Sequence, residues 1–415
     1  MKHIIKDIIE DQAGIKMPKN VVWRNIPDSF IQTEMIVVIT GVRRCGKSVL
    51  LQQIRSQSPQ NDYFFNFDDD RLSAFSQENF QDLYEAFVEL YGDEDYFFFD
   101  EIQNVNGWEH FVKRLYNMGK KVYVTGSNAK MLSRELGTLL TGCYVSHELL
   151  PFSFKEYLSF SGVKIDDKGI RGTQQRALVA ARMDEYLQTG GFPLYLLTKD
   201  DLVLKTLYDN ILYRDIMVRN SLTNEKELKE MVYYSISNIG KPVTYTSLAK
   251  IMGAKNPTTA KNYLDYVENT YLLFTITKMD YSVKAQLRNP KKIYCIDNAL
   301  TLRMGFRMSK DAGRLLENMV FLELRRRKCD IYYHNDGTHE CDFVVRDGFS
   351  VSAAYQVCYQ MENVLTRERE INGLLSALET FHLDEGWLIT ASEAEEIVVG
   401  QKKIHIVPCW QWMLE

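Results

Sequence analysis

The sequence predicts an α/β fold whose first part is built on a parallel sheet. Two apolar runs, MIVVIT (residues 35–40) and YFFFD (96–100), lack the alternation of a strand that faces water on one side. Helical periodicity comes after the first run, and strands that alternate with helices are typical of a parallel sheet covered on both faces.

The composition is that of a folded globular protein. The chain has 415 residues, of which 45% are hydrophobic and 25% charged, and this length predicts about two to four domains. The net charge of −5 excludes a surface that is basic throughout, so any nucleic-acid contact must come from a local patch. Seven scattered cysteines contain no C-x-x-C pair, which predicts reduced thiols and no zinc module.

The sequence also predicts a cytoplasmic protein with no membrane partner. No apolar run approaches the roughly 18 residues that a membrane-spanning helix needs. Acidic residues interrupt the N-terminal segment MKHIIKDIIEDQ where a signal peptide would be apolar.

Residues 41–48, GVRRCGKS, fit the pattern G-x-x-x-x-G-K-[ST] between a predicted strand and a predicted helix. Glycines at the first and sixth positions let backbone N–H groups turn inward around phosphate, next to the positive helix N-terminus. The pattern therefore predicts an ATP site. Its nucleotide-binding residues are Gly41, Val42, Arg43, Arg44, Cys45, Gly46, Lys47, Ser48 and Val49.

Catalytic roles are predicted from the strand ends. Lys47 is expected to reach the β- and γ-phosphates, while Ser48 and Asp100 hold Mg²⁺. Glu101 comes directly after, where a carboxylate can polarise the attacking water. A further strand is expected to end near Gly126, and Asn128 beyond it would sense the γ-phosphate. The alternative for Asn128 is a helix N-cap.

These motifs, together with YVTGSNAKMLS (123–133), ELGTLLTGCYVSHELLPFSFKEYL (135–158) and YLQTGGFP (186–193), resemble the AAA+ superfamily. More closely, they resemble prokaryotic ATPases in which an AAA domain precedes a C-terminal domain of unknown function. This resemblance implies a five-stranded parallel core, ATP hydrolysis and assembly of identical subunits into a ring. From Leu149 onward, helical spacing with Gly and Pro breaks would fit a small helical lid over the nucleotide.

One position departs from this resemblance. Cys143 stands where such proteins usually carry an arginine that can serve the neighbouring subunit. A thiol cannot supply a fixed positive charge, which can be worth 10³–10⁵ in rate. Arg134 is a candidate substitute, and the alternative is an exposed helix cation.

Residues 228–298 carry the pattern of a winged helix-turn-helix. Two short helices, 247–252 and 258–269, are expected on either side of a turn at Gly253, and a β-wing comes after them. Polar and basic side chains there suit phosphate and groove contacts. Winged helices also serve as protein-binding modules, which is one alternative. The other is that these cations are ordinary solvated surface charge. The candidate DNA-binding residues are Thr258, Lys261, Lys284, Arg288, Lys291 and Lys292.

The last part of the chain resembles the PD-(D/E)XK nuclease fold, also called restriction-endonuclease-like. Glu317, Asp342 and Gln356 occupy the positions that hold Mg²⁺ in that resemblance. Cys358 stands where the lysine is expected, so we predict a degenerate site that binds a ligand without nuclease activity.

Together these observations predict an ATP- and Mg²⁺-dependent ATPase coupled to DNA, which could include branched DNA. The first alternative is a nucleotide-controlled switch that captures a protein partner with little turnover, and the second is a Mg²⁺-dependent nuclease. Five parts are expected: an N-terminal helix and connector (1–33), an AAA+ core (34–155), a helical lid (156–227), a winged helix (228–298) and a nuclease-like domain (299–415).

Overall fold

The structure is a computed structural model that describes residues 1–15, 17–18, 21–57, 62–127, 140–165, 170, 172–306 and 312–415. It divides into two compact units. The first unit contains Met1–Leu150 and Asn269–Tyr271, and the second contains Pro151–Glu268 and Leu272–Glu415.

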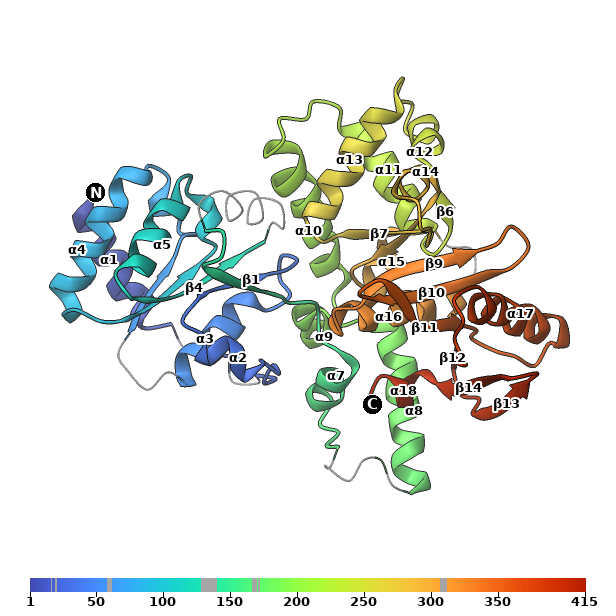
Figure 1. The fold of residues 1–415 in the computed structure, drawn as a ribbon. Coiled ribbons are helices and arrows are strands. Elements are labelled where there is room, and N and C mark those ends of the chain that lie inside the picture. Colours follow the sequence, from blue (N-terminus) through green and yellow to red (C-terminus); the bar gives the residue numbers. More distant parts are fainter. Residues whose placement is uncertain are drawn as a thin grey trace. The chain divides into compact units, whose positions relative to one another are not determined.

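The first unit contains a five-stranded sheet with the order β2-β3-β4-β1-β5. Residues 1–150 of this unit are drawn in blue to teal in Figure 1, where β1 and β4 are labelled. Every neighbouring pair is parallel, which confirms the predicted parallel core. The strands are β1 (Ile36–Thr40), β2 (Asp62–Asn66), β3 (Tyr96–Asp100), β4 (Lys121–Gly126) and β5 (Tyr144–Glu148). The α-helices are α1 (Lys2–Ala13), α2 (Asp28–Gln32), α3 (Lys47–Gln57), α4 (Phe80–Tyr91) and α5 (Trp108–Asn117).

The two faces of this sheet are covered by different helices. Alternate strand residues point to opposite faces, and one set forms a buried cluster with α1, α4 and α5. Helix α3 contacts β3 and β4, and its buried Leu50, Leu51 and Ile54 lie outside that cluster, on the other face. Burial on both faces explains why these strands are continuously apolar in sequence.

The strand register brings the functional strand ends together. Thr40 at the end of β1 pairs with Gly126 at the end of β4, and Asp100 at the end of β3 pairs with Asn66. The loop after β1, the acidic end of β3 and the end of β4 therefore share one edge of the sheet.

The second unit begins with helices. These are α7 (Phe154–Phe160), α8 (Thr173–Thr189), α9 (Pro193–Thr198), α10 (Asp201–Asn210), the π-helical segment η4 (Ile211–Val218) and α11 (Glu225–Ser237). Ser153 and Glu156 form a capping box that fixes the start of α7.

A small antiparallel sheet comes next, with the order β6-β8-β7. Its strands are β6 (Pro242–Val243), β7 (Leu273–Thr277) and β8 (Lys291–Cys295). Between β6 and β7 lie α12 (Tyr245–Ile251) and α13 (Pro257–Asn269), close to the two helices expected from the sequence. The connection from β7 to β8 contains a short helix, α14 (Val283–Arg288), within the stretch that we expected to form a β-wing.

The C-terminal part contains a six-stranded mixed sheet with the order β13-β14-β12-β11-β10-β9. The strands are β9 (Asp330–Asn335), β10 (Glu340–Asp347), β11 (Ser350–Val357), β12 (Glu385–Thr390), β13 (Glu395–Val399) and β14 (Lys402–Pro408). Its helices are α15 (Asn298–Met304), α16 (Ala312–Arg326), α17 (Val364–Thr380) and α18 (Cys409–Trp412). The buried Asn318 of α16 hydrogen-bonds both the N–H and the carbonyl of Cys295, which fixes α16 to β8.

Candidate functional site

The loop between β1 and α3 requires glycine at two positions. Gly41 and Gly46 have φ angles of 145° and 105°, in the region that side-chain-bearing residues rarely adopt. A Cβ atom on Gly41 would lie 2.1 Å from the carbonyl oxygen of Leu149. The two glycines of the sequence pattern therefore permit both the turn and the close approach of the segment that follows β5.

Lys47 is the first residue of α3, and its side chain reaches back to the preceding loop. Its side chain is buried, and its Nζ donates to the carbonyl oxygen of Val42 at 3.2 Å. The same atom lies 3.5 Å from Oε1 of Glu101. Burial alone would lower the pKa of Lys47, but Glu101, Cys45 and Asp100 together outweigh burial, so the pKa is raised. The ammonium is therefore retained at the place where phosphate would bind.

Asp100 is held at the end of β3 by a neighbouring strand. Its Oδ1 accepts a hydrogen bond of 2.5 Å from the hydroxyl of Thr125 on β4. That hydroxyl oxygen also accepts the backbone N–H of Glu101 at 2.9 Å. Burial raises the pKa of Asp100, while hydrogen bonds from Thr125 and Ser48 oppose this shift. One threonine thus orients both acidic residues, a role that the sequence patterns did not reveal.

Glu101 adopts a left-handed backbone conformation, with φ 52° and ψ 39°, directly after the strand. Its Oε2 accepts a hydrogen bond of 2.5 Å from Nε2 of Gln103. Burial alone would raise the pKa of this carboxyl, but Lys47 and then Gln103 outweigh it, so the pKa is lowered. Glu101 is therefore a carboxylate at neutral pH, as a base requires.

The oxygen atoms at this edge suit Mg²⁺, a hard cation that prefers carboxylate and hydroxyl ligands. Ser48 and Asp100 are hydrogen-bonded neighbours there. Two predicted residues, Asn128 and Arg134, lie outside the residues that the structure describes. Ser127 at the end of β4 is described and is buried.

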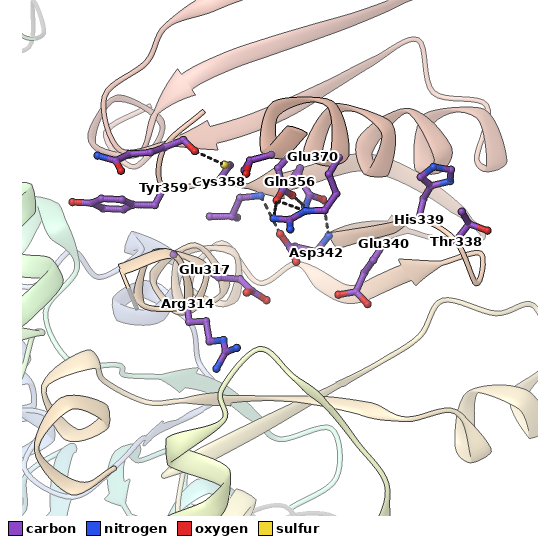
Figure 2. A pocket seen from close by; sticks show the side chains of 15 residues that line it. Arg314, Glu317, Thr338, His339, Glu340, Asp342, Gln356, Cys358, Tyr359 and Glu370 are labelled. Carbon is purple, nitrogen blue, oxygen red and sulfur yellow. Dashed lines mark hydrogen bonds and ion pairs between the residues drawn. The ribbon is translucent and has the colours of Figure 1, made fainter. Parts of the chain in front are cut away.

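The second unit contains a cavity of about 580 Å³ at the predicted degenerate nuclease site (Figure 2). Glu317 comes from α16, Asp342 from β10 and Gln356 from β11, and all three line this cavity. Arg314, Glu340, Cys358 and Glu370 are among the other lining residues. The structure therefore brings the three predicted residues to one place.

Lys292 occupies the centre of the acidic residues. Its Nζ lies 2.9 Å from Oδ1 of Asp342, 2.7 Å from Glu340 and 3.5 Å from Glu317. Burial would lower its pKa, but Asp342 and Glu317 outweigh burial and the pKa is well raised. We had expected Lys292 to contact DNA, and this expectation is corrected because its side chain is only 1% exposed. Strand β8 turns it toward the acids instead.

The remaining groups of this cluster are also paired internally. Asp342 Oδ2 accepts the backbone N–H of Val357 at 3.1 Å, and Glu317 accepts from the hydroxyl of Tyr294 at 2.7 Å. Gln356 donates to Glu370 at 2.5 Å and accepts the N–H of Asp342 at 3.1 Å. Burial and the nearby Asp342 raise the pKa of Glu317 to about 7.

The cluster therefore contains a lysine that the sequence pattern lacks, but from a different strand. Cys358, at the expected lysine position, donates to the carbonyl of Gln360 at 3.2 Å, and burial raises the pKa of its thiol to about 11. Within the described residues, no group of three or more His, Cys, Asp or Glu side chains is arranged to hold a metal ion.

The other candidate DNA-binding residues differ in exposure. Thr258 and Lys261 on α13 and Lys284 and Arg288 on α14 are exposed. Lys291 is partly buried, with its Nζ 5.5 Å from the ring centroid of Tyr245. In the part of the chain that the structure describes, no helix combines the length and apolar character needed to cross a membrane.

Two protein-family models match parts of the chain. A family model described as "AAA domain" matches residues 33–158, and one described as "Domain of unknown function (DUF8612)" matches residues 180–311. The chain is 33% identical to the uncharacterized protein MJ1544 of Methanocaldococcus jannaschii over 432 residues, which cover 100% of this chain and 96% of that protein.

Two further similarities extend this comparison. An uncharacterized protein of Haemophilus influenzae is 30% identical over 403 residues, covering 93% of this chain and 96% of its own length. Among solved structures, the RuvB Holliday junction branch migration motor of Thermotoga maritima is 18% identical, with a TM-score of 0.28. That match covers 58% of this chain and 81% of the RuvB chain, and a TM-score this low supports no inference.

Proposed function

Because this chain belongs to the family of the Methanocaldococcus jannaschii protein and carries an AAA domain of the AAA+ superfamily, we propose that it is an ATPase that uses Mg²⁺ and couples hydrolysis to DNA. One observation carries the ATP hydrolysis part of the proposal. Lys47 and Glu101 lie 3.5 Å apart at the sheet edge where Asp100 ends β3.

The residues at this edge divide the chemistry between them. Water attacks the γ-phosphorus of ATP, the bond from that phosphorus to the β–γ bridging oxygen breaks, and ADP leaves. Mg²⁺ would neutralise negative charge on the phosphates. Lys47 and the loop N–H groups would bind the phosphates, while Ser48 and Asp100 would hold the ion. Glu101 accepts the proton of the attacking water, and its lowered pKa keeps it ionised for that step.

We propose that DNA binds to the second unit through α13 and α14. Thr258 and Lys261 are exposed on one helix, and Lys284 and Arg288 on the other. Exposed cations of this kind contact phosphates, so binding must weaken as the salt concentration rises. Lys292 takes no part, since its charge is used by the acidic cluster.

The test is the steady-state ATPase rate, measured alone and with single-stranded, duplex and branched DNA at low and moderate salt. We expect one DNA form to stimulate turnover, and we expect Lys47→Ala to lose both the basal and the stimulated rate. A double variant, Lys261→Ala with Lys284→Ala, should keep the basal rate and lose stimulation. Equal rates with every nucleic acid would refute the coupling to DNA.

A second candidate is the nucleotide-controlled switch, which position 143 favours. Cys143 directly precedes β5, and the first residue of β5 pairs with Ile36, the first residue of β1. It therefore lies at the sheet edge opposite the phosphate loop, where an arginine could serve only a neighbouring copy. We propose a ring of identical subunits in which this contribution is weak. Flat turnover with tight ATP binding would support the switch and direct the search to protein partners.

We propose that the cavity of the second unit does not cleave DNA. Lys292 already forms ion pairs with Glu340 and Asp342, and the Gln356 amide is hydrogen-bonded through both its nitrogen and its oxygen. Supercoiled plasmid incubated with Mg²⁺ or Mn²⁺ should therefore remain intact. Nicking that disappears in Asp342→Asn would establish the nuclease alternative.

A further inference from the structure

Gln103 is buried beside the proposed catalytic base. It lies in the single 3₁₀ turn Ile102–Asn104 that comes directly after Glu101, and its side chain is almost wholly shielded from solvent. Its Nε2 donates to Glu101 Oε2 at 2.5 Å and lies 3.5 Å from the hydroxyl of Ser127 at the end of β4. The amide therefore lies between the base and the neighbouring strand end.

The orientation that brings the Gln103 nitrogen to Glu101 leaves the oxygen of the same amide unsatisfied among the described residues. Oε1 of Gln103 is buried and has no hydrogen-bond partner within the described part of the chain. Leaving a buried acceptor unsatisfied destabilises the folded state. The bond to Glu101 fixes which end of the amide is nitrogen, because a carboxylate can only accept. Gln103 therefore keeps its hydrogen bond to Glu101 although its own Oε1 remains without a partner in the described part of the chain.

Asn66, at the end of β2, is the other amide that could hold the base. Its Oδ1 accepts the backbone N–H of Asp68 at 2.9 Å, and its own N–H donates to Gln12 at 2.7 Å. These bonds fix Asn66 within the turn after β2. Gln103 is the amide that contacts Glu101.

We propose that Gln103 is a positioning residue that holds the Glu101 carboxylate in the orientation needed to accept a proton from water. This inference rests on the proposed ATPase function. Gln103 lies two residues after Glu101, in the turn that directly follows it, so the hydrogen bond between the two side chains is local. Lys47 contacts the other carboxylate oxygen, Oε1, and the two donors together restrict rotation of the group.

The test compares Gln103→Met with wild type in ATP hydrolysis. Methionine keeps the length of the side chain and removes the donor. We expect kcat to fall about 10- to 100-fold with KM for ATP within twofold, since misplacing a catalytic group by about 1 Å can cost 10²-fold. The acid limb of the kcat–pH profile should also move to higher pH, because a donor that stabilises the carboxylate is lost.

Two further variants separate positioning from structural support. Asn104→Leu alters the same turn without removing the contact to Glu101, since Asn104 bonds Phe67 and Asp68, and its acid limb should stay at the wild-type pH. Gln103→Glu places a second acid against Glu101 and should move the acid limb further than methionine does. If Gln103→Met loses its fold, the pH profile of Gln103→Glu provides the test.

The outcomes distinguish this inference from the proposed function. An unchanged kcat and pH profile in Gln103→Met would overturn the positioning role while leaving the ATPase intact. A raised basal rate would also overturn it, because Gln103 would then restrain the base. Absence of turnover in wild type would refute the ATPase proposal, and the inference would fall with it.

Discussion

Lys292 gives the sharpest prediction for stability. Its ammonium lies 2.7 Å and 2.9 Å from Glu340 and Asp342, at 1% side-chain exposure. Lys292→Met fills similar space and leaves these acids without their counter-ion. Removing one partner of a buried ion pair costs about 3–5 kcal/mol, so we expect a loss of free energy of unfolding in this range.

The adjacent Lys291 provides a matched control. It lies on the same strand but is partly exposed, with its Nζ 5.5 Å from the ring centroid of Tyr245, so Lys291→Met should cost about 0.5–1 kcal/mol. Urea unfolding followed by circular dichroism measures both variants, with separate transitions fitted for the two units if they unfold separately. Costs that agree within about 1 kcal/mol would refute the assignment of Lys292 as the counter-ion of a buried cluster.

The pH dependence gives this prediction a sign. The pKa of Glu317 is raised to about 7 in the folded chain, so its contribution to stability is present at low pH and lost as the pH rises through 7. Lys292 holds the pKa of Glu317 down, so removing the ammonium raises that pKa further. The deficit of Lys292→Met relative to wild type should therefore be larger at pH 8 than at pH 6. A deficit that shrinks with rising pH would contradict the reasoning.

Three further predictions concern the first unit. Thr125→Val removes the hydroxyl that orients the two acids, so ATP turnover should fall at least tenfold while a fluorescent ATP analogue still binds; unchanged turnover would exclude that role. Cys143→Arg should raise turnover at least tenfold at protein concentrations where subunits associate, and an equal rate at all concentrations would count against contact between copies. Gly41→Ala should abolish ATP binding, because the added Cβ would lie 2.1 Å from Leu149, whereas Gly142→Ala, which meets no atom within 4 Å, should bind normally.

The first unit could be predicted from the sequence because its signals are local. The glycine spacing of the loop and the apolar strands that end in polar residues each define a strand and the segment directly after it. The parallel sheet then brings those ends to one edge. Gln103 and Thr125 were missed because their roles depend on contacts across that edge. Thr125 offered a weak signal, since it is a polar residue within an otherwise apolar strand.

Lys292 shows why the second unit was harder to predict. In sequence it is one of several cations around a predicted wing, next to the partly exposed Lys291. Adjacent strand residues point to opposite faces, so the register of β8 decides which lysine turns inward. That register is set by pairing with β7 and β6 and by Asn318 of α16. No local pattern contains this information.

The role of Glu101 as the base of an ATP hydrolysis site can be tested in a single pair of proteins. ATP binding and turnover are measured on Glu101→Gln beside wild type, in the presence of Mg²⁺. We predict that the variant binds ATP about as tightly as wild type and retains it unhydrolysed, with turnover reduced at least 100-fold. Wild-type turnover in Glu101→Gln would contradict this role.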